Sequence, residues 1–179
     1  MQVLFTSVRG QRLALDCADV VEVLPVVAHR PAGTGPRWLL GLFNLRGALV
    51  PLVDLSLILD ERAEPLRRGS RIVVLRLGGA FAEGGLFGGA GDPTRTLVGL
   101  LVPEISGPFT RDFSARGAHE GFTFAGASHL GPTIVDEGEG AAPPVDGAPQ
   151  LVQLLRCRRL LEGDAALREL PRSAGEWTE

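Results

Sequence analysis

Apolar residues occur along the chain in short runs that are separated by glycine, proline and charged residues. Runs of this length, bounded by turn-forming residues and rich in valine and leucine, are typical of β-strands. The pattern therefore predicts a chain built mainly from short strands. The clearest runs cover residues 4–8, 13–16, 20–27, 71–77, 97–102 and 151–155.

Two of these runs, 71–77 and 97–102, are apolar at nearly every position. A strand with one buried face alternates between apolar and polar residues, whereas a strand buried on both faces reads as a continuous apolar run. We therefore expect both strands to lie at the centre of the core.

Turn and capping residues indicate how the runs are joined. Arg9-Gly10 begins a turn between the first two runs and predicts a hairpin, and a short helical turn is expected over 17–20. Pro25 predicts that the strand over 20–27 bends or lies at the edge of a sheet. Asp54 is a predicted N-cap for a short helix over 55–59.

The remaining segments carry weaker patterns. Residues 28–36 are predicted to form a surface loop and 104–136 to contain weaker strands. The glycine-rich segment 78–95 is longer than an ordinary hairpin loop, which has about 2–5 residues, so it is expected to be an insertion. Residues 138–149 lack periodicity and are expected to form a flexible loop.

The C-terminal part begins with a strand and ends in a charged tail. A helical turn is expected over 158–162, and residues 163–179 form the tail, with a helix expected around 165–170 that Pro171 ends. The acidic run 136–139 is interpreted as a solvated loop because it offers too few ligands for a calcium site.

Composition narrows the function. The chain has 179 residues and a net charge of −3, and all 18 of its basic residues are arginine, which reflects a base-composition bias of the source genome. The charges are scattered, so nothing resembles the basic stripe of a nucleic-acid-binding protein. No apolar run approaches the roughly 20 residues of a membrane helix, and we expect neither membrane insertion nor a secretory signal.

Cofactor and catalytic patterns are also missing from the sequence. Two cysteines are too few for a disulfide framework and predict a reduced protein of the cytoplasm. The glycine-rich segment lacks the Gly-Lys-Ser/Thr ending of a phosphate-binding loop. His29, His119 and His129 have no metal-binding spacing. We therefore expect no cofactor, no metal and no enzymatic activity.

Residues 41–55 hold the most distinctive pattern, because a polar tetrad interrupts two apolar runs there. Arg46 has two interpretations. It could pair with Glu22 and hold two strands together, since a guanidinium binds a carboxylate through parallel hydrogen bonds; or it could contact a partner. Gly41 and Gly47 are expected to allow backbone geometry that a side chain would block.

This segment resembles a known family. Gly41, Asn44-Leu45-Arg46-Gly47, Val50-Pro51 and Asp54-Leu55 are similar to the pattern of CheW-like proteins, the adaptors that couple bacterial chemoreceptors to the histidine kinase CheA. The resemblance covers roughly residues 3–162. It implies an all-β fold of two small packed five-stranded barrels with short helical turns, in one domain over residues 1–162.

The resemblance also implies partners and a site. The partners would be the cytoplasmic tip of a methyl-accepting chemoreceptor and the regulatory domain of a CheA-type histidine kinase, at membrane-associated receptor arrays in the cytoplasm. The hairpin over 48–53 would belong to the kinase-binding face. The receptor-binding groove between the barrels would contain Val20, Glu22, Val23, Gly41, Arg46 and Ile72, and the structural residues of the motif would be Asn44, Leu45, Gly47, Pro51 and Asp54.

Two departures leave alternatives open. Pro103 stands where the family commonly has an acidic residue, and the segments 78–95 and 138–149 are long. The chain could therefore be a divergent relative that binds only one of the two partners, in another sensory or motility pathway. A small β-barrel enzyme or ligand-binding protein is a third interpretation, which the lack of a convergent His/Asp/Cys set disfavours.

Overall fold

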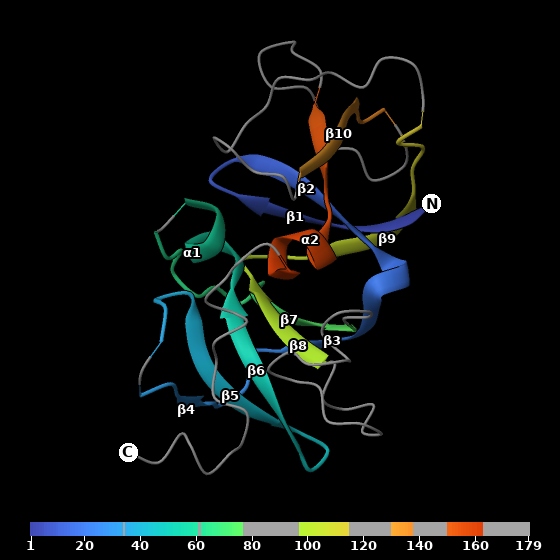
Figure 1. Ribbon diagram of the computed structural model, residues 1–179. Coiled ribbons are helices and arrows are strands. Elements are labelled where there is room, and N and C mark those ends of the chain that lie inside the picture. The colour runs from blue at the N-terminus through green and yellow to red at the C-terminus, as the bar shows by residue number, and fades with distance from the viewer. Residues whose placement is uncertain (34, 61, 77–96, 115–129, 138–149, 163–179) are drawn as a thin grey trace.

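The computed structural model shows two β-sheets packed against each other, one above the other in Figure 1, with short helices beside them. The structure describes residues 1–33, 35–60, 62–76, 97–114, 130–137 and 150–162. The expected loops 78–95 and 138–149 and the tail 163–179 lie outside these ranges. The all-β prediction is confirmed.

The first sheet has five strands in the order β10-β11-β2-β1-β9. Its antiparallel β1–β2 hairpin is joined in parallel to β11, so the end of the described chain pairs with its beginning. Its strands are β1 (Gln2–Val8), β2 (Gln11–Asp16), β9 (Ser106–Thr110), β10 (Leu130–Val135) and β11 (Leu151–Leu155).

The second sheet has six strands in the order β3-β7-β8-β6-β5-β4. The β5–β6 hairpin is joined in parallel to β8, and β3 lies at one edge, as Pro25 predicts. The strands are β3 (Val20–Pro25), β4 (Arg30–Pro31), β5 (Leu39–Leu45), β6 (Ala48–Asp54), β7 (Arg71–Arg76) and β8 (Leu97–Val102).

Three short helices accompany the sheets: η1 (Cys17–Asp19), α1 (Leu55–Asp60) and α2 (Cys157–Glu162). All three occur where the sequence predicts helical turns. None of the helices in the described part of the chain is long and apolar enough to cross a membrane.

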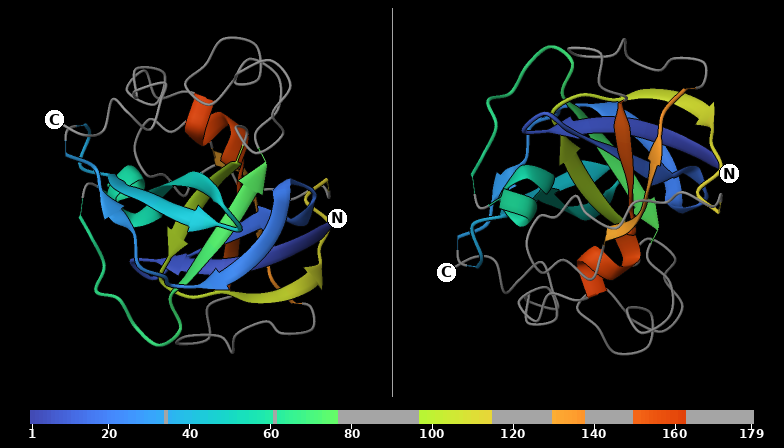
Figure 2. Two further views of the ribbon diagram at one scale, coloured as in Figure 1. Left: turned by 90° about the horizontal axis from the view of Figure 1, so that it is seen from below. Right: turned by 90° about the horizontal axis from the view of Figure 1, so that it is seen from above.

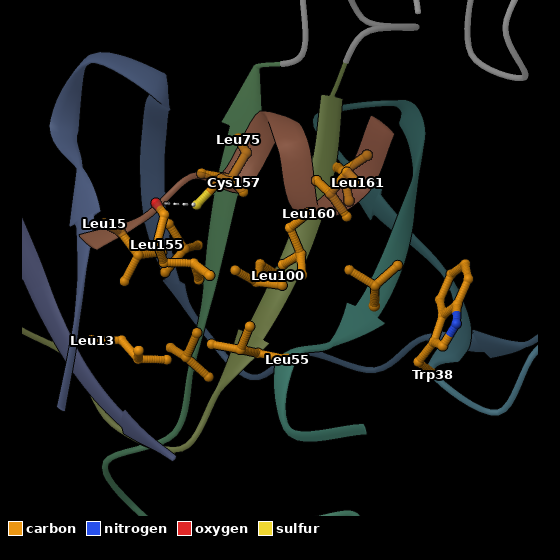
Figure 3. Close-up of a cluster of buried hydrophobic side chains, with 14 of the residues drawn as sticks. Leu13, Leu15, Trp38, Leu55, Leu75, Leu100, Leu155, Cys157, Leu160 and Leu161 are labelled. Atoms are coloured by element: carbon orange, nitrogen blue, oxygen red, sulfur yellow. Dashed lines mark hydrogen bonds between the residues drawn. The ribbon is translucent and has the colours of Figure 1, made fainter. Parts of the chain in front are cut away.

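Three apolar clusters account for the strand pattern. One lies between the two sheets and includes residues of α1 and α2; Figure 3 shows Leu160 and Leu161 of α2 beside Leu100. The other two lie within the six-stranded and the five-stranded sheet. On β7, Val73 and Leu75 join the cluster between the sheets, whereas Ile72 and Val74 join the cluster of the six-stranded sheet. Because β7 and β8 are buried on both faces, their continuous apolar runs are explained.

The expectation of two closed five-stranded barrels needs correction in detail. Among the described residues, neither ladder of hydrogen bonds joins its first strand to its last, so the subdomains are two open sheets. The second sheet gains a sixth strand because Arg30 and Pro31, in the predicted loop over 28–36, pair with Leu42 and Gly41. Pro31 has no backbone N–H, which suits an edge position.

Candidate functional site

The β5–β6 turn gives the polar tetrad its shape. Leu45 pairs with Ala48, so Arg46 and Gly47 are the two central residues, with φ of 52° and 93°. Two positive φ values in a two-residue hairpin define a turn that follows the right-handed twist of the strands. The Asn44 side chain accepts a hydrogen bond of 2.7 Å from the Gly47 N–H. Arg46 therefore lies in the turn between β5 and β6 and not on either strand.

A second Arg-Gly pair adopts the same geometry. Arg9 and Gly10 have φ of 52° and 78° between the paired residues Val8 and Gln11. Arg9 Nε lies 2.7 Å from Asp60, at the end of α1. Both hairpins thus use an Arg-Gly pair at the centre of the turn, and the two arginines differ in the residues that they contact.

Arg46 pairs with Glu22, as the sequence predicts. Its Nη2 lies 2.8 Å from Glu22 Oε2, and the Arg46 side chain is 79% exposed. In the hydrogen-bonded order, β7 and β8 lie between β3 and the β5–β6 hairpin. Leu24 of β3 and Leu45 of β5 nevertheless pack on one apolar cluster. The sheet therefore curls around that cluster, and the ion pair spans the gap between its first strand and the turn.

The pair leaves hydrogen-bonding capacity unused. Glu22 Oε1 is buried and has no hydrogen-bond partner in the described part of the chain. A buried oxygen without a partner costs about 1–3 kcal/mol. Arg46 donates to Glu22 through Nη2, and the guanidinium has further N–H groups in reach of solvent. The rim of the curled sheet can therefore donate hydrogen bonds to a partner through Arg46, whereas Glu22 Oε1 lies below the surface.

The alternation of β3 divides the residues expected in one groove. Val20, Glu22 and Leu24 are half-buried, whereas Val21 and Val23 are 39% and 38% exposed. Val23 therefore lies on the opposite face of the strand from Val20 and Glu22. Sequence reasoning missed Val21, although the two-residue period of a strand would have paired it with Val23.

Two further groove candidates lie below the surface. Ile72 has no exposed surface and pairs with Leu24 inside the six-stranded sheet. Gly41 is buried with φ of 149°, and a Cβ there would overlap the Arg30 carbonyl oxygen. These residues support the rim from within: Ile72 by packing, and Gly41 by letting β4 approach.

The other motif residues have structural roles. Leu45 packs against the inner cluster. Pro51 is buried in β6 directly before Leu52, where pairing with β8 begins, so its missing N–H interrupts no bond to β8. Asp54 Oδ1 accepts hydrogen bonds from Ser56 N and Leu57 N at 2.8 and 3.1 Å, which confirms the predicted cap.

Asp54 is also electrostatically unusual. Burial raises the pKa of its carboxyl above the ordinary value, and the hydrogen bonds from Leu57 and Ser56 oppose that rise. No arginine of the described residues forms an ion pair with Asp54, and its hydrogen-bond donors there are backbone N–H groups. Asp54 is thus a cap whose desolvation is only partly compensated.

Sequence reasoning missed a buried ionic cluster in the five-stranded sheet. Asp136 lies 2.6 Å from Arg111 Nε and 3.1 Å from Arg12 Nη1, and its side chain is completely buried. The Arg12 and Arg111 guanidiniums also lie over the Phe5 ring, 4.3 and 5.1 Å from its centroid. The interpretation of Asp136 as part of a solvated loop is therefore wrong.

No local feature of the sequence reveals this cluster. The three charged residues come from β2, from the end of β9 and from the end of β10, and they meet only after the sheet has assembled. Asp136 also follows the last residue of a strand, a position where a solvated carboxylate is common. His29 is exposed, while His119 and His129 lie outside the described residues.

Comparisons with known proteins agree with this architecture. The sequence profile of the CheW-like domain family matches residues 2–165. The chain is 29% identical over 66 residues to the chemotaxis protein CheW of Helicobacter pylori, a match that spans 37% of this chain and only 40% of that relative.

A solved structure shows the same fold. The scaffolding protein TtCheW from Thermoanaerobacter tengcongensis superposes with a TM-score of 0.65 at 18% identity. The superposition covers 89% of this chain and 86% of the other. At this identity the likeness concerns the arrangement of strands.

Proposed function

The chain belongs to the CheW-like family, and we propose that it is a non-enzymatic adaptor that couples chemoreceptors to a CheA-type histidine kinase. In this role it would hold the cytoplasmic tip of a methyl-accepting chemoreceptor and the kinase regulatory domain next to each other, in the cytoplasm at the receptor array. Residues 1–162 would carry the role, with 163–179 as an appended tail.

One observation carries the receptor-binding part of this proposal. The curled sheet has a rim with the Arg46–Glu22 pair, in which Glu22 Oε1 is buried without a partner among the described residues. Exposed Val21 and Val23 lie on the same edge strand. Binding surfaces for helical segments combine a few apolar anchors with polar groups that fix orientation. The rim has both.

The proposal assigns separate tasks to these groups. Val23 would bury apolar surface against the receptor, and Arg46 would fix the orientation of the bound receptor through charge-assisted hydrogen bonds. Glu22 would hold the Arg46 guanidinium in place through Oε2. Ile72 and Gly41 would act indirectly by shaping the sheet beneath. Several modest interfaces of this kind suffice in an array, because each partner is held at high effective concentration.

The kinase would use another part of the surface. Residues 48–53, which the sequence predicts as a hairpin, instead form part of the single strand β6, in which Leu49 is 53% exposed and the residues from Val50 to Val53 are buried. Leu49 is therefore the exposed apolar side chain of this strand that can reach a kinase domain. We propose it as an apolar contact on the kinase-binding face.

Calorimetric titrations test the proposal with the two partners measured separately. The receptor tip and the kinase regulatory domain are each titrated into the full chain. We expect Arg46→Ala to weaken receptor binding and to leave kinase binding unchanged, and Leu49→Ser to do the reverse. Arg37→Ala, an exposed arginine away from the rim, is the matched control.

The outcomes separate the alternatives. Absence of binding to either partner at about 50 µM would rule out the adaptor role. Binding to one partner alone would establish the divergent alternative. Pro103 does not favour that alternative, because it follows β8 and lies beyond Val102, the last residue of the β7–β8 ladder.

A further inference from the structure

The segment between α1 and β7 forms a basic projection. Arg62, Arg67 and Arg68 are exposed there, and Leu66 is 62% exposed, the highest value among the large exposed apolar residues of the described chain. In both views of Figure 2 this green loop runs along the outside of the molecule, and Glu64, Pro65 and Leu66 line a small hollow together with Leu101 and Val102 of β8. A single exposed leucine needs no explanation, but Leu66 is followed directly by Arg67 and Arg68 on a projecting loop, which combines two kinds of contact group.

The projection is a hydrogen-bonded turn. Arg67 N donates to Ser70 Oγ at 2.9 Å, and Ser70 N donates to the Arg67 carbonyl at 3.0 Å. The Ser70 hydroxyl also donates to the Pro103 carbonyl at 3.1 Å, which ties the turn to the end of β8. Ser70 is buried, so the turn rests on an anchored residue. Its side chains are therefore presented on a fixed backbone.

The arginines of the turn divide into two groups. Arg71 Nη1 donates to the Arg68 and Ser70 carbonyls, both at 2.8 Å, so this guanidinium stabilises the turn. In the described ranges, Arg67 and Arg68 form no ion pair with a carboxylate. Their guanidiniums are available to an external partner.

Two of the acidic residues near the projection are engaged elsewhere, while the exposed Glu104 lies beside Gly69 of the turn. Glu64 accepts the Arg9 N–H at 2.7 Å, and Asp60 pairs with the Arg9 side chain. Because both carboxylates bind the β1–β2 turn, they do not pair with Arg67 or Arg68. The outer end of the projection therefore keeps a local positive charge on a chain whose net charge is −3.

We propose that Arg62, Leu66, Arg67 and Arg68 form a docking surface for an acidic, leucine-containing peptide segment of a partner protein. A guanidinium binds carboxylates through paired hydrogen bonds, and the rigid turn lowers the ordering cost of binding. The apolar contact at Leu66 favours a peptide over a bare phosphate. The negative net charge opposes long polyanions such as nucleic acids. This surface goes beyond the proposed adaptor role and does not depend on it.

A direct binding experiment with the full chain tests this surface. The probe is a fluorescein-labelled peptide, Glu-Glu-Leu-Glu-Glu-Leu-Glu-Glu, followed by anisotropy, and its contacts are mapped from amide chemical shifts. We expect shifts concentrated at residues 62–71 and an affinity that falls as salt rises from 50 to 200 mM, since exposed charges are screened. The double variant Arg67→Glu/Arg68→Glu should weaken binding at least tenfold, and Leu66→Ser several-fold.

The controls keep the test decisive. Arg30→Glu/Arg37→Glu makes the same change in net charge at exposed positions elsewhere and should retain binding. If that variant loses binding equally, the surface is not specific and the proposal is overturned. Absence of peptide binding at about 1 mM, or tighter binding to phosphatidylserine vesicles than to the peptide, overturns it as well. If Arg67→Glu/Arg68→Glu lowers the melting temperature, the neutral variant Arg67→Gln/Arg68→Gln is measured in its place.

Discussion

The two sheets use arginine and carboxylate in opposite ways. In the five-stranded sheet, Asp136 is completely buried between Arg12 and Arg111. In the six-stranded sheet, Arg46 is 79% exposed and joins Glu22 across the gap between two strands. The ionic distances are similar, from 2.6 to 3.1 Å, so contact geometry alone does not distinguish the two arrangements.

Burial makes the difference. Removing one member of a buried pair leaves an uncompensated charge in a medium of low polarity, and this is strongly destabilising. The Arg46–Glu22 pair contributes less, because water solvates the exposed guanidinium, although the Glu22 side chain is only 18% exposed. The buried cluster is therefore expected to hold the first sheet together, while the exposed pair is free to serve binding.

The largest effect is expected from Asp136→Ala. It leaves Arg12 and Arg111 without the carboxylate between them, and the free energy of unfolding should fall by about 3–5 kcal/mol. Urea denaturation measures this change. Glu137→Ala, at the exposed neighbouring position, should shift the unfolding free energy by less than about 0.5 kcal/mol. A similar loss in both variants would show that burial does not govern the cluster.

Two glycines of the motif test the same contrast between buried and exposed positions. Gly41→Ala should destabilise by about 3 kcal/mol, because the new methyl group meets the Arg30 carbonyl at a backbone φ of 149°. Gly47→Ala meets no atom within 4 Å and should cost only about 1 kcal/mol for its positive φ. Thermal melts of both variants provide the comparison, and equal losses would contradict it.

Asp54 sharpens the comparison, since it is a buried carboxylate held by backbone N–H groups. Because burial raises its folded-state pKa above the ordinary 3.8, the folded state binds the proton more tightly than the unfolded state. Its contribution to stability is therefore greatest below the unfolded-state pKa and is lost as the pH rises through the raised folded-state pKa.

The measurement uses Asp54→Asn, which keeps an oxygen for the cap. Relative to this variant, the wild-type chain should lose stability as the pH rises from 3.5, and the difference should level off above the folded-state pKa. Urea denaturation across this pH series follows the difference. A wild-type chain that gains relative stability over the same range would reverse the assigned direction.

The smallest effect on stability is expected from Arg46→Ala. The exposed pair should contribute at most about 1 kcal/mol, and a double-mutant cycle with Glu22→Gln isolates the coupling energy. Denaturation of the four proteins gives this value. A coupling energy above about 2 kcal/mol would make the pair chiefly a stabilising contact and would weaken the case for a binding role.

Much of the fold could be predicted because its physical causes are local. The apolar runs over 71–77 and 97–102 predict strands that are buried on both faces, and Asp54 predicts a helix cap. The proposed Arg46–Glu22 pair is also present. Successive residues of a strand point to opposite faces, so the two faces of β3 could also have been predicted from the sequence. The predicted groove nevertheless placed Val23 together with Val20 and Glu22.

Other features depend on residues far apart in the sequence. The Asp136 cluster joins strands that meet only in the assembled sheet. The pairing of β4 with β5 requires a residue without a side chain at position 41, because the Arg30 carbonyl oxygen approaches Gly41 closely. Burial is the sum of contacts from many segments, so the sequence around Asp136 could not distinguish it from a solvated carboxylate.

The sequence by itself determined that this chain forms strands, where its turns and caps lie, and that its motif resembles the CheW-like family. Hydrophobic periodicity and turn chemistry act over a few residues, so they can be read locally. The tertiary structure decided which charges are buried and which remain exposed. That distinction arises from long-range packing, and it separates Asp136, which we expect to stabilise the fold, from Arg46, which we propose to bind a partner.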